Sequence, residues 1–142
     1  MAFELFVNGT LMRGLPLHKN MGDSEFLGEF RTEPRYRLYA IGDVHPGMYR
    51  LEDGEAGGVA VVGELYCVSD ATWQQIANGE PANLYRGEVK LEDGRVVLGI
   101  LYPRDLAEGK QRDISEYGDW RRYMESKGVE NRRESSELVN AR

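Results

Sequence analysis

Two short segments of the 142-residue chain carry residues that could bind a small molecule and act on it. In the first, an apolar stretch ending at Phe6-Val7 runs directly into Asn8-Gly9-Thr10-Leu11. Glycine permits a tight turn, and consecutive backbone N–H groups in such a turn commonly hold small anionic groups. This segment predicts one wall of a ligand site.

The second segment is a short connection between apolar stretches and contains Glu80. Its neighbours over 77–83 are small or uncharged, so Glu80 does not belong to a charged face. A carboxylate removed from water has a raised pKa, which lets it take up and return a proton near neutral pH. Glu80 is therefore the candidate catalytic acid and base, although the local sequence also fits an exposed loop glutamate.

Motifs that would indicate other chemistries are missing from the sequence. It has no Walker-type loop, no GxGxxG, no HExxH and no GxSxG. His18 and His45 are the only histidines, they lack metal-ligand spacing, and both are expected to be surface or turn residues. With Cys67 as the only cysteine, neither an internal disulfide nor a CxxC site can form. We therefore expect no metal and no cofactor.

The overall charge narrows the class of partner. The formal charge of −6 and the pI near 5.0 argue against a nucleic-acid or acidic-membrane surface, since such binding depends on clustered Lys and Arg. The sequence contains neither a signal-peptide pattern nor an apolar run of membrane-spanning length. A small-molecule ligand and a cytoplasmic location are expected, while the sequence does not indicate an oligomeric state.

Short strands separated by glycine turns must position these two segments. Alternating or β-branched apolar residues predict strands over 3–7, 25–32, 35–41, 48–51 and 59–68, followed by a short helix to about residue 77. Asp93-Gly94 predicts a hairpin between strands 84–91 and 95–102. About six or seven strands with short helices indicate an α+β, mostly β fold, a small closed or nearly closed mixed barrel.

The end of the chain has a different pattern. Ile114, Tyr117, Trp120 and Met124 recur at helical spacing and would lay an apolar stripe against the barrel. The residues from Lys127 onward are mostly polar and charged. We expect one domain over 1–126 and a mobile tail over 127–142, to which no function is assigned.

Four of these segments occur in an order that resembles a known superfamily. They are the turn 6–11 with Arg13-Gly14, the 46–48 Pro-Gly-Met, the 62–66 Val-Gly-Glu-Leu-Tyr, and Glu80 followed by Tyr85-Arg86. Together they are similar to the γ-glutamylcyclotransferase-like (AIG2-like) superfamily over about residues 3–102. Within it, the segments 13–17, 32–39 and 89–95 with Gly99 most resemble the C-terminal domain of allophanate hydrolase and its stand-alone relatives.

The resemblance implies an enzyme that needs no cofactor and releases 5-oxoproline and a free amine from a γ-glutamyl amide. Glu80 would act first as base and then as acid, and Tyr85 would hydrogen-bond to Glu80 or to the substrate. The backbone N–H groups of Asn8, Gly9, Thr10 and Leu11 would bind the α-carboxylate or the developing oxyanion. Two positions depart from the usual pattern: Asn8 replaces an aromatic residue, and Pro81 replaces a glycine.

Two alternatives remain open from the sequence. A stand-alone relative of the allophanate hydrolase domain would bind or process a small carboxylated amide in urea or allophanate metabolism, including an unstable carboxylated nitrogen intermediate. A non-catalytic interaction module would use the acidic surface instead. Because one fold hosts many activities, the fold alone does not decide between them.

Overall fold

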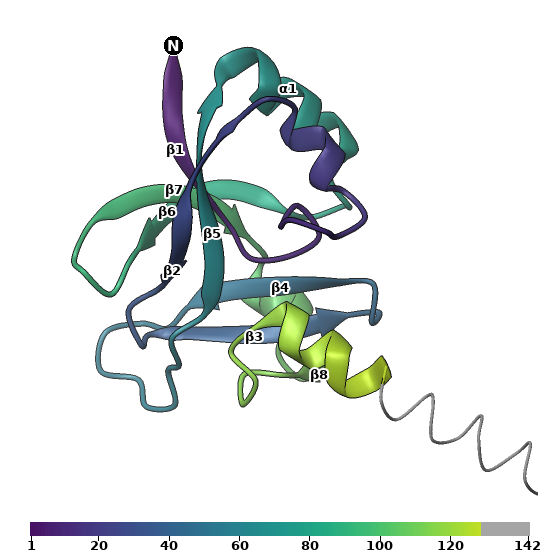
Figure 1. Cartoon of the computed structure of the whole chain (residues 1–142). Coiled ribbons are helices and arrows are strands. Elements are labelled where there is room, and N and C mark those ends of the chain that lie inside the picture. Colours follow the sequence, from purple (N-terminus) through teal and green to yellow (C-terminus); the bar gives the residue numbers. More distant parts are fainter. Residues whose placement is uncertain (129–142) are drawn as a thin grey trace, which may run out of the picture.

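The computed structural model describes residues 1–128, which form two β-sheets with short helices at their margins (Figure 1). The larger sheet has the strand order β2-β5-β1-β7-β6, and the smaller has the order β4-β3-β8. The elements are β1 (Ala2–Val7), η1 (His18–Met21), β2 (Glu25–Arg31), β3 (Tyr36–Ile41), β4 (His45–Arg50), β5 (Val62–Ser69), α1 (Asp70–Gly79), β6 (Tyr85–Lys90), β7 (Val96–Leu101), α2 (Arg104–Ala107) and β8 (Arg112–Asp113).

The mostly β, α+β architecture is confirmed, whereas the closed form of the predicted barrel is not found, because the described strands form two separate sheets. The chain leaves the larger sheet after β2 at Pro34, which cannot donate a ladder hydrogen bond, and β3 then begins the smaller sheet. An isolated bridge between Tyr36 and Val59 joins the two sheets, and another between Thr32 and Leu91 connects the ends of β2 and β6, the two edge strands of the larger sheet. The sheets therefore enclose one continuous core while remaining separate ladders.

The central strand of the larger sheet, β1, ends next to the candidate ligand site. β1 lies between β5, with which it is antiparallel, and β7, with which it is parallel. Leu5, Phe6 and Val7 are almost completely buried, because a central strand is covered by its neighbours and by the core. β1 ends at Val7, so the turn 8–11 emerges from a rigid and buried element.

α1 brings Glu80 to the same end of the molecule. The helix begins after Ser69, whose hydroxyl accepts a hydrogen bond from the Thr72 backbone N–H at 3.1 Å. It ends at Gly79, and Glu80 has extended backbone geometry at the C-cap position. The helix packs beside η1 and buries Ile76, so its end has a defined place over the larger sheet (Figure 1).

β4 begins earlier than the sequence predicts. The prediction placed a Pro46-Gly47 turn before a strand over 48–51, whereas the strand already includes His45 and Pro46. β4 is an edge strand of the smaller sheet, and a strand edge tolerates a proline that lacks an N–H donor. The hairpin of β6 and β7, by contrast, has the predicted position.

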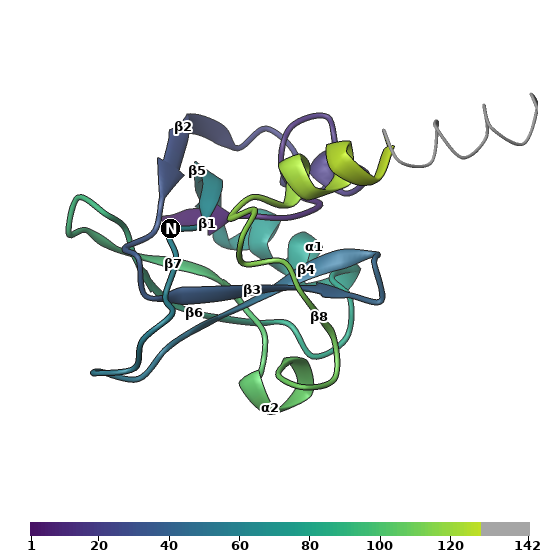
Figure 2. The same ribbon diagram turned by 90° about the horizontal axis from the view of Figure 1, so that it is seen from below.

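The predicted C-terminal stripe is helical only in its second part. Ile114 and Trp120 are buried, but Gly118 has a φ of +62°, and the helix occupies 120–128. In Figure 2 this helix, yellow-green, lies near the loop that follows β1. Apart from the first two residues, the tail predicted over 127–142 lies outside the described residues. Within residues 1–128, no helix is long and apolar enough to cross a membrane.

Candidate active site

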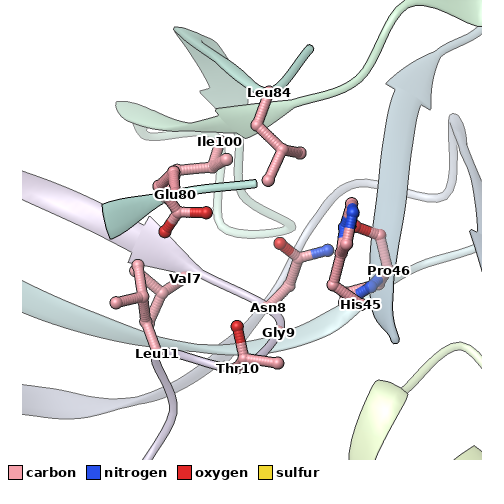
Figure 3. A pocket seen from close by; sticks show the side chains of 10 residues that line it. All are labelled: Val7, Asn8, Gly9, Thr10, Leu11, His45, Pro46, Glu80, Leu84 and Ile100. Atoms are coloured by element: carbon pink, nitrogen blue, oxygen red, sulfur yellow. The ribbon is translucent and has the colours of Figure 1, made fainter. Parts of the chain in front are cut away.

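A pocket that is partly open to solvent lies where the end of β1, the start of β4 and the α1–β6 connection converge (Figure 3). Its walls combine apolar side chains with a few polar groups that face the same space. Such a composition is typical of small-molecule sites. The lining residues are Val7, Asn8, Gly9, Thr10, Leu11, His45, Pro46, Glu80, Leu84 and Ile100.

The turn 8–11 forms one wall and presents free backbone donors. The Gly9 carbonyl accepts from the Met12 N–H at 3.0 Å, and the Thr10 carbonyl accepts from the Leu17 N–H at 2.9 Å. Among residues 1–128, nothing accepts a hydrogen bond from the N–H of Gly9, Thr10 or Leu11. A turn whose carbonyls are bonded and whose N–H groups are free is suited to bind an anion.

The opposite wall of the pocket leaves no room for a side chain at Gly9. A Cβ atom at this position would lie 2.7 Å from both Cγ and Cδ of Pro46, which is closer than packed carbon atoms approach. Glycine therefore lets the turn 8–11 and the start of β4 touch directly.

Glu80 forms a third side of the pocket, and its carboxylate points toward the turn (Figure 3). Partial burial removes water from the carboxylate and raises the pKa of Glu80 to about 7. In the described part of the chain, no hydrogen bond or ion pair offsets this desolvation. Near neutral pH the group can therefore both accept and donate a proton.

Asn8 and His45 supply the other polar groups of the pocket. The Asn8 side chain is buried, with its Nδ2 atom 3.7 Å from the Met48 sulfur. His45 Nδ1 lies 3.0 Å from the Pro46 carbonyl oxygen, which can only accept, so Nδ1 carries the proton in this hydrogen bond. The amide of Asn8 and the imidazole of His45 can both contact a ligand that enters the pocket.

The structure brings together five of the six residues that the sequence analysis proposed. Asn8, Gly9, Thr10 and Leu11 line the pocket with Glu80. Tyr85 does not line it: this residue opens β6 opposite Leu101, and 48% of its surface is exposed. Leu84, immediately before the strand, occupies the pocket wall instead.

His45 shows where sequence reasoning missed a functional position. It was expected at the surface or in a turn, and this prediction is wrong because only 7% of its surface is exposed. Its ring packs edge-on to Tyr102, with the ring centroids 6.3 Å apart. The burial depends on a long-range contact between the sheets, which the neighbouring residues do not indicate. The Pro46-Gly47 pair, noted from the resemblance, was the available signal.

Behind the turn 8–11 lies a completely buried carboxylate, Glu64 on β5. It accepts hydrogen bonds from the Arg13 backbone N–H at 2.8 Å, from Arg13 Nε at 3.1 Å and from the Tyr66 hydroxyl at 3.0 Å. Burial raises the pKa of Glu64, but these donors outweigh it, so the pKa lies below its usual value. Glu64 is therefore ionised at neutral pH and anchors the chain that follows the turn.

The fold and the pocket together match a described family. The model of the allophanate hydrolase C-terminal domain matches residues 3–125, and the chain belongs to this family. It also belongs to the wider group of AIG2-like, γ-glutamylcyclotransferase-like proteins, as the resemblance indicated. The match covers every residue that lines the pocket.

Individual proteins similar to this chain include a γ-glutamylcyclotransferase-like protein and an allophanate hydrolase. A Vibrio cholerae protein named "Putative gamma-glutamylcyclotransferase" is 38% identical over 118 residues, which are 82% of this chain and 93% of that protein. A crystal structure of a uropathogenic Escherichia coli-specific protein has a TM-score of 0.80 and 44% identity, covering 87% of this chain and 96% of that chain. Kluyveromyces lactis allophanate hydrolase has a TM-score of 0.78 and 28% identity, covering 89% of this chain but only 21% of that chain.

Proposed function

We propose that the protein is a γ-glutamylcyclotransferase-like enzyme, in which Glu80 is the general acid and base. The substrate is a γ-glutamyl amide, and the products are 5-oxoproline and a free amine. The observation that carries this proposal is the Glu80 carboxylate, which is desolvated, has a pKa raised to about 7, and faces the free N–H groups of the turn 8–11 across one pocket.

The reaction requires a group that takes a proton from the attacking nitrogen and gives a proton to the nitrogen of the leaving amine. Glu80 removes a proton from the α-ammonium, because only the neutral amine has the lone pair that attacks the side-chain carbonyl carbon. The new C–N bond closes a five-membered ring and gives a tetrahedral intermediate. Glu80 then gives its proton to the nitrogen of the leaving amine as the original C–N bond breaks. It also takes the second proton from the ring nitrogen and passes it to the released amine, which departs as an ammonium. The proton balance closes without water or a cofactor.

The turn 8–11 supplies electrostatic stabilisation. Its free N–H groups would bind either the α-carboxylate or the oxyanion of the tetrahedral intermediate. The apolar contacts of Leu11, Leu84 and Ile100 would keep the glutamyl chain folded back on itself. Such folding places amine and carbonyl carbon in reach of each other, and proximity of this kind contributes strongly to ring closure.

The direct test is a panel of γ-glutamyl amines and γ-glutamyl peptides, with 5-oxoproline and the free amine measured as products. Glu80→Gln keeps the size of the side chain but cannot take the proton, so kcat/KM should fall by about 10²–10⁴-fold. The matched control is Glu88→Gln, an exposed glutamate on β6 outside the pocket, which should retain wild-type activity.

Two results would contradict the proposal. Wild-type activity in Glu80→Gln would remove this residue from the proton transfers. No 5-oxoproline from any member of the panel, with folded wild-type protein, would exclude the cyclotransferase activity in this form. The second result would leave the pocket without an assigned reaction.

The family match favours a second candidate function, binding or processing of a small carboxylated amide related to allophanate. The same free N–H groups and the buried Asn8 and His45 would hold its carboxylate. Under this function, millimolar malonate or allophanate would raise the melting temperature, because a ligand bound only by the folded state stabilises it. A melting shift with these compounds, combined with no 5-oxoproline, would favour this candidate over the first.

A further inference from the structure

The helix over 120–128 contacts chain segments that adjoin two walls of the pocket. Its residues do not line the pocket, and two of its side chains bond to Arg13 and Asp43, each two residues away from a lining residue. One contact is made to the chain after the turn 8–11, and the other to the turn between β3 and β4. These three segments are far apart in the sequence.

The first contact is made by Arg121. Its guanidinium donates to the Arg13 carbonyl oxygen at 2.6 Å, and it lies 3.8 Å from the buried Glu64 carboxylate. Arg13 also donates its own N–H to Glu64. The Arg13 peptide is therefore fixed on both sides, two residues after Leu11, by a charged group of the helix and a charged group of β5. A hydrogen bond to a charged group is among the stronger ones in proteins.

The second contact is made by Tyr123. Its hydroxyl donates to Asp43 Oδ1 at 2.6 Å, and Lys127 Nζ lies 3.1 Å from the other oxygen of the same carboxylate. Asp43 belongs to the turn that leads directly into His45 and Pro46, and it has a φ of +58°. The helix thus holds a turn whose backbone geometry is unfavourable for a residue with a Cβ atom.

The helix can orient these segments only if its own position is fixed, and its packing shows that it is. Trp120 and Tyr123 are almost completely buried, and their rings pack with centroids 5.6 Å apart. Just before the helix, the Gly118 carbonyl accepts from the Val62 N–H at 2.8 Å, at the start of β5. The helix is therefore attached to the larger sheet as well as to both turns.

We propose that the helix over 120–128 positions the two pocket walls, with Arg121 and Tyr123 as positioning residues for the turn 8–11 and for His45-Pro46. Neither residue touches the substrate. The direct contact of Gly9 with Pro46 sets how close the walls come, and the helix sets how they are oriented. The catalytic consequence rests on the proposed function, whereas the positioning itself does not.

Hydrogen exchange of single amides tests the positioning without any substrate. In Arg121→Met, the N–H groups of Met12 and Leu17, which bond to the carbonyls of Gly9 and Thr10, should exchange about tenfold to a hundredfold faster. In Tyr123→Phe, the Val44 N–H, which bonds to the Ile41 carbonyl, should exchange about tenfold faster. Amides of the β6–β7 hairpin should keep their wild-type rates in both variants.

Matched controls come from the same part of the chain. Arg122→Met removes an exposed arginine next to Arg121 that has no ion pair within residues 1–128. Tyr117→Phe removes a neighbouring hydroxyl whose one hydrogen-bond partner within residues 1–128 is Ser126. Both should leave the exchange of Met12, Leu17 and Val44 unchanged. Arg121→Lys, which retains a charged donor, should restore part of the protection at Met12.

Turnover then tests the consequence for catalysis. Arg121→Met should lower kcat on the best panel substrate about tenfold at a temperature where the variant remains folded, whereas Arg122→Met should retain the wild-type kcat. Unchanged exchange at Met12, Leu17 and Val44 in both variants would overturn the positioning role, whatever the activity. Faster exchange with unchanged kcat would overturn its catalytic consequence. Absence of turnover in the wild type would instead refute the proposed function, and the exchange comparison would still decide the role of the helix.

Discussion

Glu64 and Glu80 have opposite environments, although Glu80 lines the pocket and Glu64 lies behind one of its walls. Glu64 is completely buried on β5, but four charged or polar groups surround its carboxylate, and its pKa is lowered. Glu80 is only partly buried on a connection, and desolvation acts on it without compensation, so its pKa is raised to about 7. The number of hydrogen-bond donors, more than the depth of burial, determines whether a carboxylate is a structural anion or a group that exchanges protons.

The comparison predicts that the loss of Glu64 is a defect of folding. Glu64→Leu removes the acceptor for Arg13 and Tyr66 and should reduce the free energy of unfolding by about 3 kcal/mol, measured by urea denaturation at pH 7. Arg13 is half exposed and can regain water, which keeps the loss at this value. Glu25→Leu, an exposed position on the edge strand β2, is the control and should change stability by less than about 0.5 kcal/mol. Equal stability of the two variants would show that the Glu64 hydrogen bonds contribute nothing.

Glu80 is predicted to govern the pH dependence of the rate. As a base it must be ionised, so kcat/KM should rise with pH through a limb near 7, with about a hundredfold difference between pH 5 and pH 8. Glu64 is already ionised across this range because its pKa is lowered, so it cannot produce such a limb. A profile that is flat from pH 5 to pH 8 would separate Glu80 from the rate-determining proton transfer.

The same two groups should act on stability with opposite signs. The pKa of Glu80 is raised on folding, so its contribution is fully present below the unfolded value near 4.5 and is lost as the pH rises through about 7. Glu80→Gln should therefore be more stable than the wild type at pH 8, by about 1–2 kcal/mol after allowance for partial exposure. The pKa of Glu64 is lowered, so its contribution is present above 4.5 and is lost as the pH falls through its folded value.

Urea denaturation of the wild type and Glu80→Gln at pH 5 and pH 8 checks this prediction. The difference between the two proteins should be larger at pH 8, where the wild-type carboxylate is ionised in a poorly solvated position. Glu88→Gln, with its exposed side chain, should show no such dependence. A gain for Glu80→Gln that is the same at both pH values would mean that charge is not its cause.

The sequence predicted the elements better than their assembly. The β6–β7 hairpin and the short helix α1 depend on neighbouring residues, such as Asp93-Gly94 in the hairpin, and both lie where the sequence predicts them. The parallel pairing of β1 with β7 and the division into two sheets depend on contacts between distant segments, which local patterns do not contain. The position of β4 was missed for the same reason.

In the candidate site, too, the features set by neighbouring residues were predictable and those set by distant contacts were not. Glu80 and the turn 8–11 were predictable because an uncharged connection and a glycine turn are visible in the sequence. The burial of His45 was not, since it results from packing against Tyr102 across the molecule. The hydrogen bonds of Glu64 could have been predicted, because a glutamate lies within the largely apolar segment of β5. A buried carboxylate without hydrogen-bond donors would destabilise the fold by several kcal/mol.

The smallest effect is predicted for Tyr85, whose assignment came from the resemblance. Its phenol is about half exposed at the start of β6 and is not part of the pocket wall, so removal of the hydroxyl takes nothing from Glu80 or from a bound ligand. Tyr85→Phe should change kcat/KM by less than twofold, on a scale where a lost hydrogen bond to a charged group costs tenfold or more. A loss of tenfold or more, without a change in melting temperature, would mean that Tyr85 moves to the pocket when substrate binds. In that case the contrast between Glu64 and Glu80 would narrow, because Glu80 would then have a hydrogen-bond donor in the complex.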